Sequence, residues 1–181
     1  MARIDALTKE QAHADVQPIF DGMKQKLGMI PNIYATLANS PAALKANLAL
    51  GDSLKAGSLS MKEVETVALS VSQINNCAYC LAAHTAVGKM AGFTEEETIA
   101  IRTGEITDTK IKALSDLTKE ITNSKGYPTE ATLNAFYNAG YSKATLIEVI
   151  GLVALNTFNN YFNHIAETPV DFPLAKEVQT T

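Results

Sequence analysis

The chain contains two cysteines, Cys77 and Cys80, and a histidine, His84, follows the second of them after three residues. In an α-helix, side chains three and four positions apart lie on one face, about one turn from each other. Two thiols can exchange electrons, and an imidazole beside them can take up the proton that a cysteine loses on becoming a thiolate. The spacing therefore favours a redox site on one helix face.

Asn76 precedes the first cysteine and is a typical helix N-cap residue. We therefore predict a helix that is capped by Asn76, carries both cysteines in its first turn and ends near Gly92. The free amides and the positive dipole end there favour a thiolate, most strongly at Cys77. His84 is nearer to Cys80 on the helix face. A base within reach supplies both the thiolate and a route for its proton, so we predict that Cys80 is the nucleophile.

Glu65 lies on the preceding segment, on a flank otherwise without charge. It is either a buried acid with a partner or an exposed acid at a helix start, where the dipole favours it. Two other interpretations of the cysteines stay open. They can be small buried apolar side chains, or they can bind zinc with His84. A fourth zinc ligand would have to be Glu65, because His13 and His164 are remote in sequence. We predict no metal and no cofactor.

Composition narrows the class of protein. The 181 residues suffice for one well-packed domain, and the net charge of −4 without a Lys/Arg block gives nucleic-acid binding no support. The uncharged run 66–88 is interrupted by polar residues, so we expect no membrane span. The N-terminal residues lack the apolar region of a signal peptide, and we expect a cytoplasmic protein, in which a C-x-x-C pair is typically redox-active or metal-binding.

Helix caps and apolar residues at helical spacing recur along the whole chain, and no β-period run of useful length appears. We predict an all-α fold in one domain over 1–181, a single-domain helical bundle with a core motif region at 19–101 and a second helical half at about 106–170. The expected helices cover about 8–27, 40–56, 60–74, 77–92, 94–104, 108–125, 129–139 and 142–167.

A weak internal repeat links the two halves at an offset of 83 residues. It pairs Glu65 with Glu148 and places the two cysteines on Asn160 and Asn163. Few identities support a duplication, and chance similarity between buried helices explains them nearly as well.

Three segments resemble the carboxymuconolactone decarboxylase superfamily, in its alkylhydroperoxidase AhpD-like, peroxidase-related branch. They are the run 27–32 (Leu-Gly-Met-Ile-Pro-Asn), Ser40-Pro41 with the helix after it, and Glu65 followed by eleven residues and Cys77-x-x-Cys80-x-x-x-His84. The match covers about 19–101, with a looser match at 159–164.

The resemblance implies an all-helical fold assembled as a homo-oligomer, often a trimer or hexamer. It also implies roles for four residues: Cys80 attacks a hydroperoxide, Cys77 resolves the sulfenic acid to a disulfide, and Glu65 with His84 relays the proton. A lipoyl or thioredoxin-type dithiol then reduces the pair. AhpD itself has a histidine where this chain has Tyr79, which leaves the full relay and the reductant open.

These observations predict a thiol-dependent peroxidase with an antioxidant function that acts on a hydroperoxide substrate. One alternative is a thiol–disulfide oxidoreductase that acts on a protein or lipoyl partner. The other is an oligomeric redox sensor that is oxidised without turnover.

Overall fold

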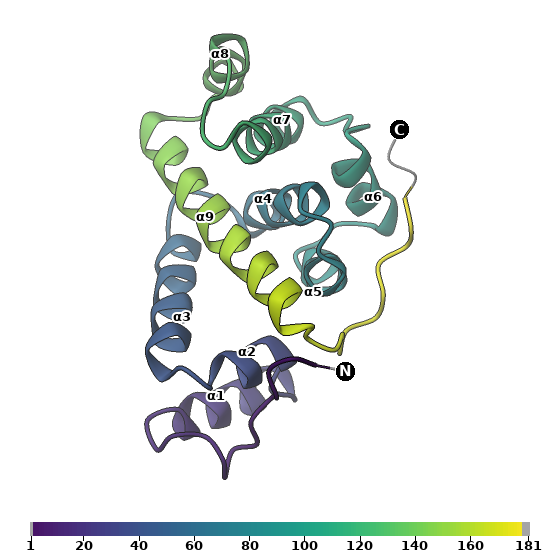
Figure 1. Cartoon of the computed structure of the whole chain (residues 1–181). Coiled ribbons are helices and arrows are strands. Elements are labelled where there is room, and N and C mark those ends of the chain that lie inside the picture. The colour runs from purple at the N-terminus through teal and green to yellow at the C-terminus, as the bar shows by residue number, and fades with distance from the viewer. Residues whose placement is uncertain (1, 179–181) are drawn as a thin grey trace.

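The computed structural model describes residues 2–178, and the regular elements in that range are all α-helices (Figure 1). The predicted all-α fold is confirmed. The helices are α1 (Gln17–Leu27), α2 (Asn32–Leu37), α3 (Pro41–Lys55), α4 (Met61–Ile74), α5 (Ala78–Met90), α6 (Glu95–Thr103), α7 (Thr109–Ser124), α8 (Glu130–Asn138) and α9 (Lys143–Ala166). Among these residues, no helix combines the length and the apolar character that crossing a bilayer requires.

The first helix begins at Gln17, not near Thr8 as predicted. The expected cap contacts do form, since the Thr8 amide donates to Gln11 Oε1 at 2.9 Å, but only turns follow them. Pro18 explains the difference. A proline is tolerated in the first helical turn, where its missing N–H would be unpaired anyway, and it disrupts a helix interior.

The short helix α2 follows Pro31, where the sequence analysis expects only a turn. No side chain caps its N-terminus, and four of its six residues are buried: Ile33, Ala35, Thr36 and Leu37. Helices this short are unstable alone, so packing against the rest of the molecule stabilises α2, and local sequence signals do not predict it.

The later helices begin at or beside the predicted caps. Ser60 and Thr94 form complete capping boxes at the starts of α4 and α6, and Asp108, Thr129 and Ser142 accept backbone N–H groups at α7, α8 and α9. Each cap satisfies amides that the first turn leaves unpaired.

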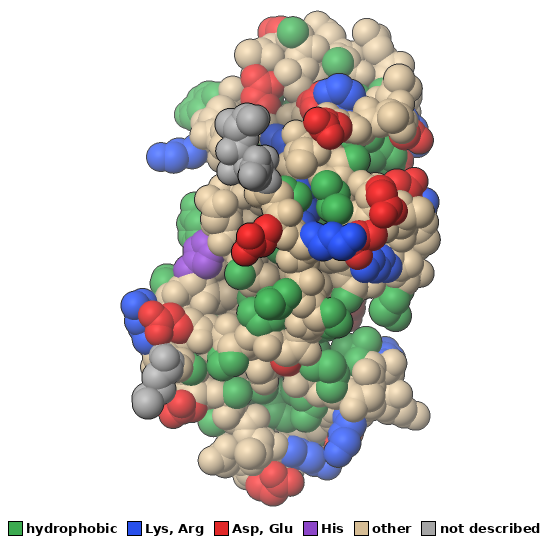
Figure 2. Space-filling model, turned by 90° about the vertical axis from the view of Figure 1, so that its right-hand side faces the viewer, with side chains coloured by type: hydrophobic (Ala, Val, Ile, Leu, Met, Phe, Trp, Pro, Cys, Tyr) green, Lys and Arg blue, Asp and Glu red, His purple; other side chains and the backbone are tan. Residues whose placement is uncertain are grey.

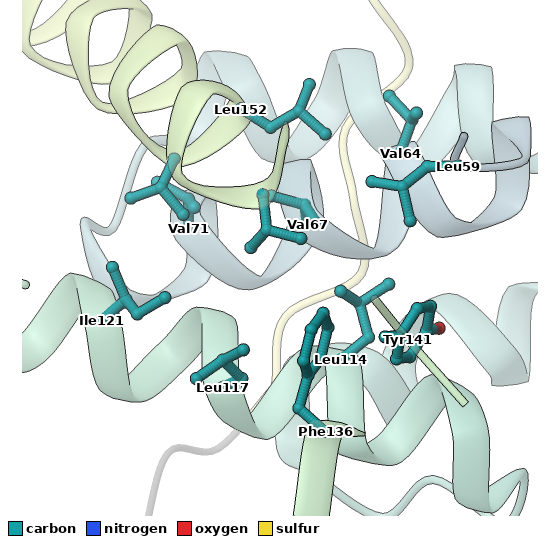
Figure 3. Packing of buried hydrophobic residues seen from close by; sticks show 12 residues of the cluster. Leu59, Val64, Val67, Val71, Leu114, Leu117, Ile121, Phe136, Tyr141 and Leu152 are labelled. Carbon is teal, nitrogen blue, oxygen red and sulfur yellow. The ribbon is translucent and has the colours of Figure 1, made fainter. Parts of the chain in front are cut away.

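Helix α4 lies at the centre of the molecule, with α5, α7 and α9 around it (Figure 1). Its residues from Glu63 to Gln73 are buried, as expected for a helix with neighbours on several sides. Figure 3 shows an apolar cluster in which Val64, Val67 and Val71 of α4 lie among residues of α7, with Phe136 of α8 and Leu152 of α9. This cluster fixes the helix from which the site is built.

A second apolar cluster joins α1, α2 and α3 to the start of α5, and it includes both cysteines and Tyr79. After α9, the chain runs in extended form past α5 and α6 (Figure 1). Figure 2 shows this side of the molecule, where acidic and basic side chains are intermixed. Arg102 of α6 holds the C-terminal segment by donating to the carbonyl of Lys176 at 2.7 Å.

Glu63 connects three elements through one buried carboxylate. It accepts hydrogen bonds from Ser60 at the start of α4 and from the Tyr141 hydroxyl (2.9 Å) ahead of α9, and it pairs with Lys110 of α7 (3.0 Å). Burial alone would raise the pKa of Glu63, but these hydrogen bonds outweigh burial and lower the pKa to about 2.

We expect Glu63→Gln to lower the free energy of unfolding at pH 7 by roughly 2–3 kcal/mol, because each unit of pKa depression corresponds to about 1.4 kcal/mol. Since the folded pKa lies below the unfolded value, this contribution is complete above about pH 5 and disappears as the pH falls towards 2. Urea unfolding at a series of pH values measures it. Glu97→Gln, at the exposed capping box of α6, is the control and should change stability by less than about 1 kcal/mol. A stability gap between Glu63→Gln and wild type that does not depend on pH would contradict this account.

Candidate functional site

The chain breaks between α4 and α5 at Asn75 and Asn76, and this break places the cysteines. Asn76 has a φ of 52°, in the left-handed region that asparagine tolerates. Its N–H donates to the carbonyl of Gln73, and the N–H of Cys77 donates to Ser72, the two bonds of a Schellman motif. Asn76 therefore ends α4. The prediction that it caps the cysteine helix is wrong, because its backbone is already used to stop the preceding helix.

Cys77 occupies the N-cap position of α5 instead. Its backbone is extended, and its sulfur accepts the N–H of Cys80 at 3.3 Å, as a capping oxygen would. Cys80 is the third residue of the helix, so the predicted first-turn location holds for Cys80, while Cys77 lies just outside the helix. The two cysteines form a disulfide, with 5.3 Å between their Cα atoms. The structure thus places a redox-capable pair at a helix N-terminus.

His84 lies one turn after Cys80 in α5, and its Nδ1 is 2.8 Å from Glu65 Oε2 of α4. An ionised carboxylate only accepts hydrogen bonds, so Nδ1 carries the proton, and Nε2 of a neutral ring is left as the acceptor. Glu65 is 2% exposed, which places it in the first of its two predicted settings, as a buried acid with a partner. Two of the predicted site residues, Glu65 and His84, therefore meet where α4 packs against α5, and the cysteines lie nearer the start of α5.

Exposure differs sharply among the four site residues. Cys77 and Cys80 are 0% and 3% exposed and Glu65 is buried, whereas a quarter of the His84 side chain is exposed. Of these four side chains, His84 is the most exposed to solvent.

The other two histidines lie outside the site. His13, in the turns before α1, has Asp15 as its neighbour at 3.9 Å, and His164 is exposed on α9. Within residues 2–178, no three His, Cys, Asp or Glu side chains are grouped so that they could hold a metal ion. Glu65, the candidate fourth ligand, is hydrogen-bonded to His84. The geometry gives the zinc alternative no support.

Tyr79, between the cysteines, anchors the start of α5. Its hydroxyl accepts the N–H of Ile33 in α2 at 3.2 Å, and its ring meets Phe172 of the C-terminal segment edge to face, with centroids 5.9 Å apart. Burial raises the pKa of the Tyr79 phenol, and the carboxylate of Asp171 raises it further, so the group stays neutral at physiological pH. Tyr79 thus has a structural position where AhpD has a histidine.

Sequence reasoning did not select one residue that contacts the disulfide. Asn163 of α9 donates from Nδ2 to Cys80 Sγ at 3.3 Å, and both residues are buried. The signal that could have found it was the internal repeat, which pairs Asn163 with Cys80. The repeat pairs Cys77 with Asn160, which lies in the same region. Asn160 accepts a hydrogen bond from Asn75 (2.9 Å) and donates one to Ser72 (3.4 Å) at the end of α4.

Comparisons with known proteins find a matching family model and several similar folds. Residues 41–120 match the model of the carboxymuconolactone decarboxylase family. One similar solved structure is an alkylhydroperoxidase AhpD core, a peroxidase-related protein from Ralstonia eutropha JMP134 (TM-score 0.86, 19% identity, 94% of this chain and 92% of that one). Another is a peroxidase-related protein from Silicibacter sp. TM1040 (0.78, 22%, 92% of each chain). A variant of the debrominase Bmp8, bound to 2,3,4-tribromopyrrole, is also similar (0.80, 18%, 94% and 92%).

No curated protein sequence matches the chain. The structural likeness defines the class, an all-helical AhpD-like fold. The family match over the helices that carry the cysteines points in the same direction as the resemblance: residues 41–120 are similar to the carboxymuconolactone decarboxylase family, and the fold is similar to that of AhpD-like proteins.

We expect Tyr79→Phe to lower the free energy of unfolding by about 1–3 kcal/mol, because the buried amide of Ile33 loses its acceptor while the ring keeps its packing. Chemical unfolding followed by circular dichroism measures the loss. Tyr127→Phe, at an 83% exposed tyrosine, serves as the control and should stay within about 0.5 kcal/mol of wild type. Equal stability of wild type and Tyr79→Phe would show that this hydrogen bond contributes nothing.

Proposed function

We propose that this protein is a thiol-dependent peroxidase that reduces hydroperoxides with the Cys77–Cys80 pair. The observation that carries the proposal is the location of the pair at the N-terminus of α5, one turn from a His84 ring held by a buried carboxylate. This arrangement supplies a stabilised thiolate, a second thiol and a proton carrier within about two turns of helix.

The cysteine pair is oxidised in two steps, and a third step reduces it again. The Cys80 thiolate attacks the distal oxygen of a hydroperoxide, the O–O bond breaks, and the alkoxide takes a proton to leave as an alcohol, while Cys80 becomes a sulfenic acid. The Cys77 thiol then attacks that sulfur, and water leaves as the disulfide forms. An external dithiol, of lipoyl or thioredoxin type, returns the pair to two thiols and is itself oxidised to a disulfide.

His84 and Glu65 have one task in this cycle. His84 Nε2 accepts the proton of the Cys80 thiol and later returns a proton to a departing oxygen, while Glu65 stabilises the imidazolium that forms in between. The hydrogen bond to Nδ1 also fixes the ring orientation, as second-shell carboxylates do in other histidine sites.

Proteins of this fold have more than one activity, because the similar solved structures include peroxidase-related proteins and a debrominase. The burial of both sulfurs favours a small oxidant over a protein disulfide, since a partner protein would have to reach sulfurs that are 0% and 3% exposed. For the same reason, a lipoyl dithiol suits the reduction step better than a thioredoxin-type protein. The oxidoreductase and sensor alternatives are distinguished by turnover: the sensor is oxidised once, and the oxidoreductase prefers a disulfide to a peroxide.

We also propose that the protein assembles as a homo-oligomer through α9 and α3. The outer face of α9 carries exposed apolar side chains at spacings of three and four residues, and 149–166 contains no Lys, Arg, Asp or Glu. A groove of about 270 Å³ between α3 and α9, lined by Leu50, Ala154 and Phe158 among others, continues this face. The large apolar side chains of α9 that are exposed are Ile147, Ile150, Phe158, Tyr161 and Ile165. Apolar faces of this kind mark protein interfaces.

We expect Cys80→Ser to abolish peroxide consumption, because the attacking sulfur is gone. Cys77→Ser should consume one equivalent of peroxide and accumulate a sulfenic acid that dimedone traps. Peroxide consumption with dihydrolipoamide as donor, with a bromopyrrole and a protein disulfide as competing oxidants, measures both variants and separates the alternatives. Wild-type turnover in both single variants would disprove the mechanism.

Phe158→Glu should convert the assembly to monomers, since a charge placed in the groove cannot be buried against a second copy. Size-exclusion chromatography with light scattering reports the mass. Tyr127→Glu adds the same charge at an exposed aromatic residue away from α9 and should leave the mass unchanged. If wild type is already a monomer, the proposed interface is wrong.

A further inference from the structure

We propose that Asn163 belongs to the reactive site and makes Cys80 the attacking thiolate, by donating a hydrogen bond from its side-chain amide to the sulfur. The proposal deepens the function proposed above and rests on it for the meaning of "attacking". The contact itself, 3.3 Å from Nδ2 to Sγ, does not depend on the substrate.

Burial gives this hydrogen bond its importance. Asn163 is 5% exposed and Cys80 is 3% exposed, so water contributes little to solvating the sulfur. A buried thiolate is unfavourable unless donors point at it, and a donor to the charged form lowers the pKa of a thiol. The Asn163 amide is such a donor.

The two sulfurs have different kinds of partner. Cys77 Sγ accepts the backbone N–H of Cys80, whereas Cys80 Sγ accepts a side-chain N–H from a helix 83 residues further along the chain. The backbone bond lies within the first turn of α5, whereas the amide that contacts Cys80 comes from a separate helix, α9. This asymmetry favours Cys80 as the thiolate, the opposite of what the helix dipole alone favours.

The position of Asn163 is fixed by its backbone. Its carbonyl accepts the N–H groups of Glu167 and Thr168 (3.2 Å for the latter), which close the C-terminus of α9. The amide is thus held on a terminated helix, so its donor has a defined direction towards α5.

The carbonyl oxygen of the Asn163 side chain can also take part in the site. Asn163 Oδ1 is buried and has no hydrogen-bond partner among residues 2–178. An unpaired buried acceptor is unfavourable, because it has lost its hydrogen bonds to water. The S–O–H group of a sulfenic acid on Cys80 would supply the missing donor, while Nδ2 continues to donate. One amide can therefore serve the thiolate before attack and the sulfenic acid after it.

The test measures the pKa of the Cys80 thiol in a Cys77→Ser background, from the pH dependence of its alkylation by iodoacetamide. Asn163→Leu, which keeps the volume and removes the donor, should raise the midpoint by about one pH unit, a tenfold loss of thiolate below it. Asn163→Ala removes the donor with less demand on packing and should shift the midpoint in the same direction, so the test stands if the leucine variant does not fold.

Asn156→Leu is the matched control, because Asn156 is an equally buried asparagine of α9 that bonds only the carbonyl of Leu152 among the described residues. Its midpoint should equal that of the Cys77→Ser parent. An unchanged or lowered midpoint in both Asn163 variants would overturn the proposal, since a lowered value means that the amide accepts from the thiol.

The alkylation assay needs no peroxide, so the two proposals fail separately. A raised midpoint without peroxide turnover in wild type supports the role of Asn163 and rejects the peroxidase. Peroxide turnover with an unshifted midpoint supports the peroxidase and rejects the role of Asn163.

Discussion

The hydrogen bond between Glu65 and His84 is the constraint on which the rest of the site depends. A carboxylate on the central helix, 2% exposed, would be strongly unfavourable without a partner. His84 provides that partner only if α5 returns alongside α4 in one register, with Cys80 one turn nearer its N-terminus. The chain achieves this register through the left-handed Asn76, which ends α4 and turns the backbone immediately before Cys77. The stability of the fold and the chemistry of the site therefore depend on the same contact.

Helix α9 explains why the break between α4 and α5 can exist inside the molecule. At the offset of the internal repeat, α9 runs without interruption where the other half breaks, and its Asn160 and Asn163 lie against that break. Backbone and side-chain polar groups exposed by ending a helix in the interior must find partners. These two amides supply some of them. A disulfide site at a buried helix end needs such a neighbour.

Much of this could be predicted from the sequence, because helix caps act over three or four residues. Ser60 and Asp108 lie at the predicted starts of their helices. The joint role of Glu65 and His84 was implied by the family resemblance, whereas spacing alone left two settings open for Glu65. The errors have two causes. One is competition between neighbouring signals in the sequence, and the other is contact with distant segments. Pro18 sets the start of the first helix at Gln17, although the cap contact at Thr8 forms. Asn76 satisfies the rule for a helix end as well as for a helix start. No local rule could connect α9 to Cys80, since that contact is set by tertiary packing.

The exchange of a histidine for Tyr79 narrows how the site can work. Tyr79 is neutral, and its hydroxyl accepts the amide of Ile33, so the proton carriers next to the sulfurs are reduced to His84 and its carboxylate. His84 is also the partly exposed member of the site. In the proposed mechanism, proton exchange therefore passes through one side chain, while the tyrosine fixes the helix start that carries the cysteines. In this chain, the residue between the two cysteines thus has a packing role, and the proposed proton route rests on His84 and Glu65 alone.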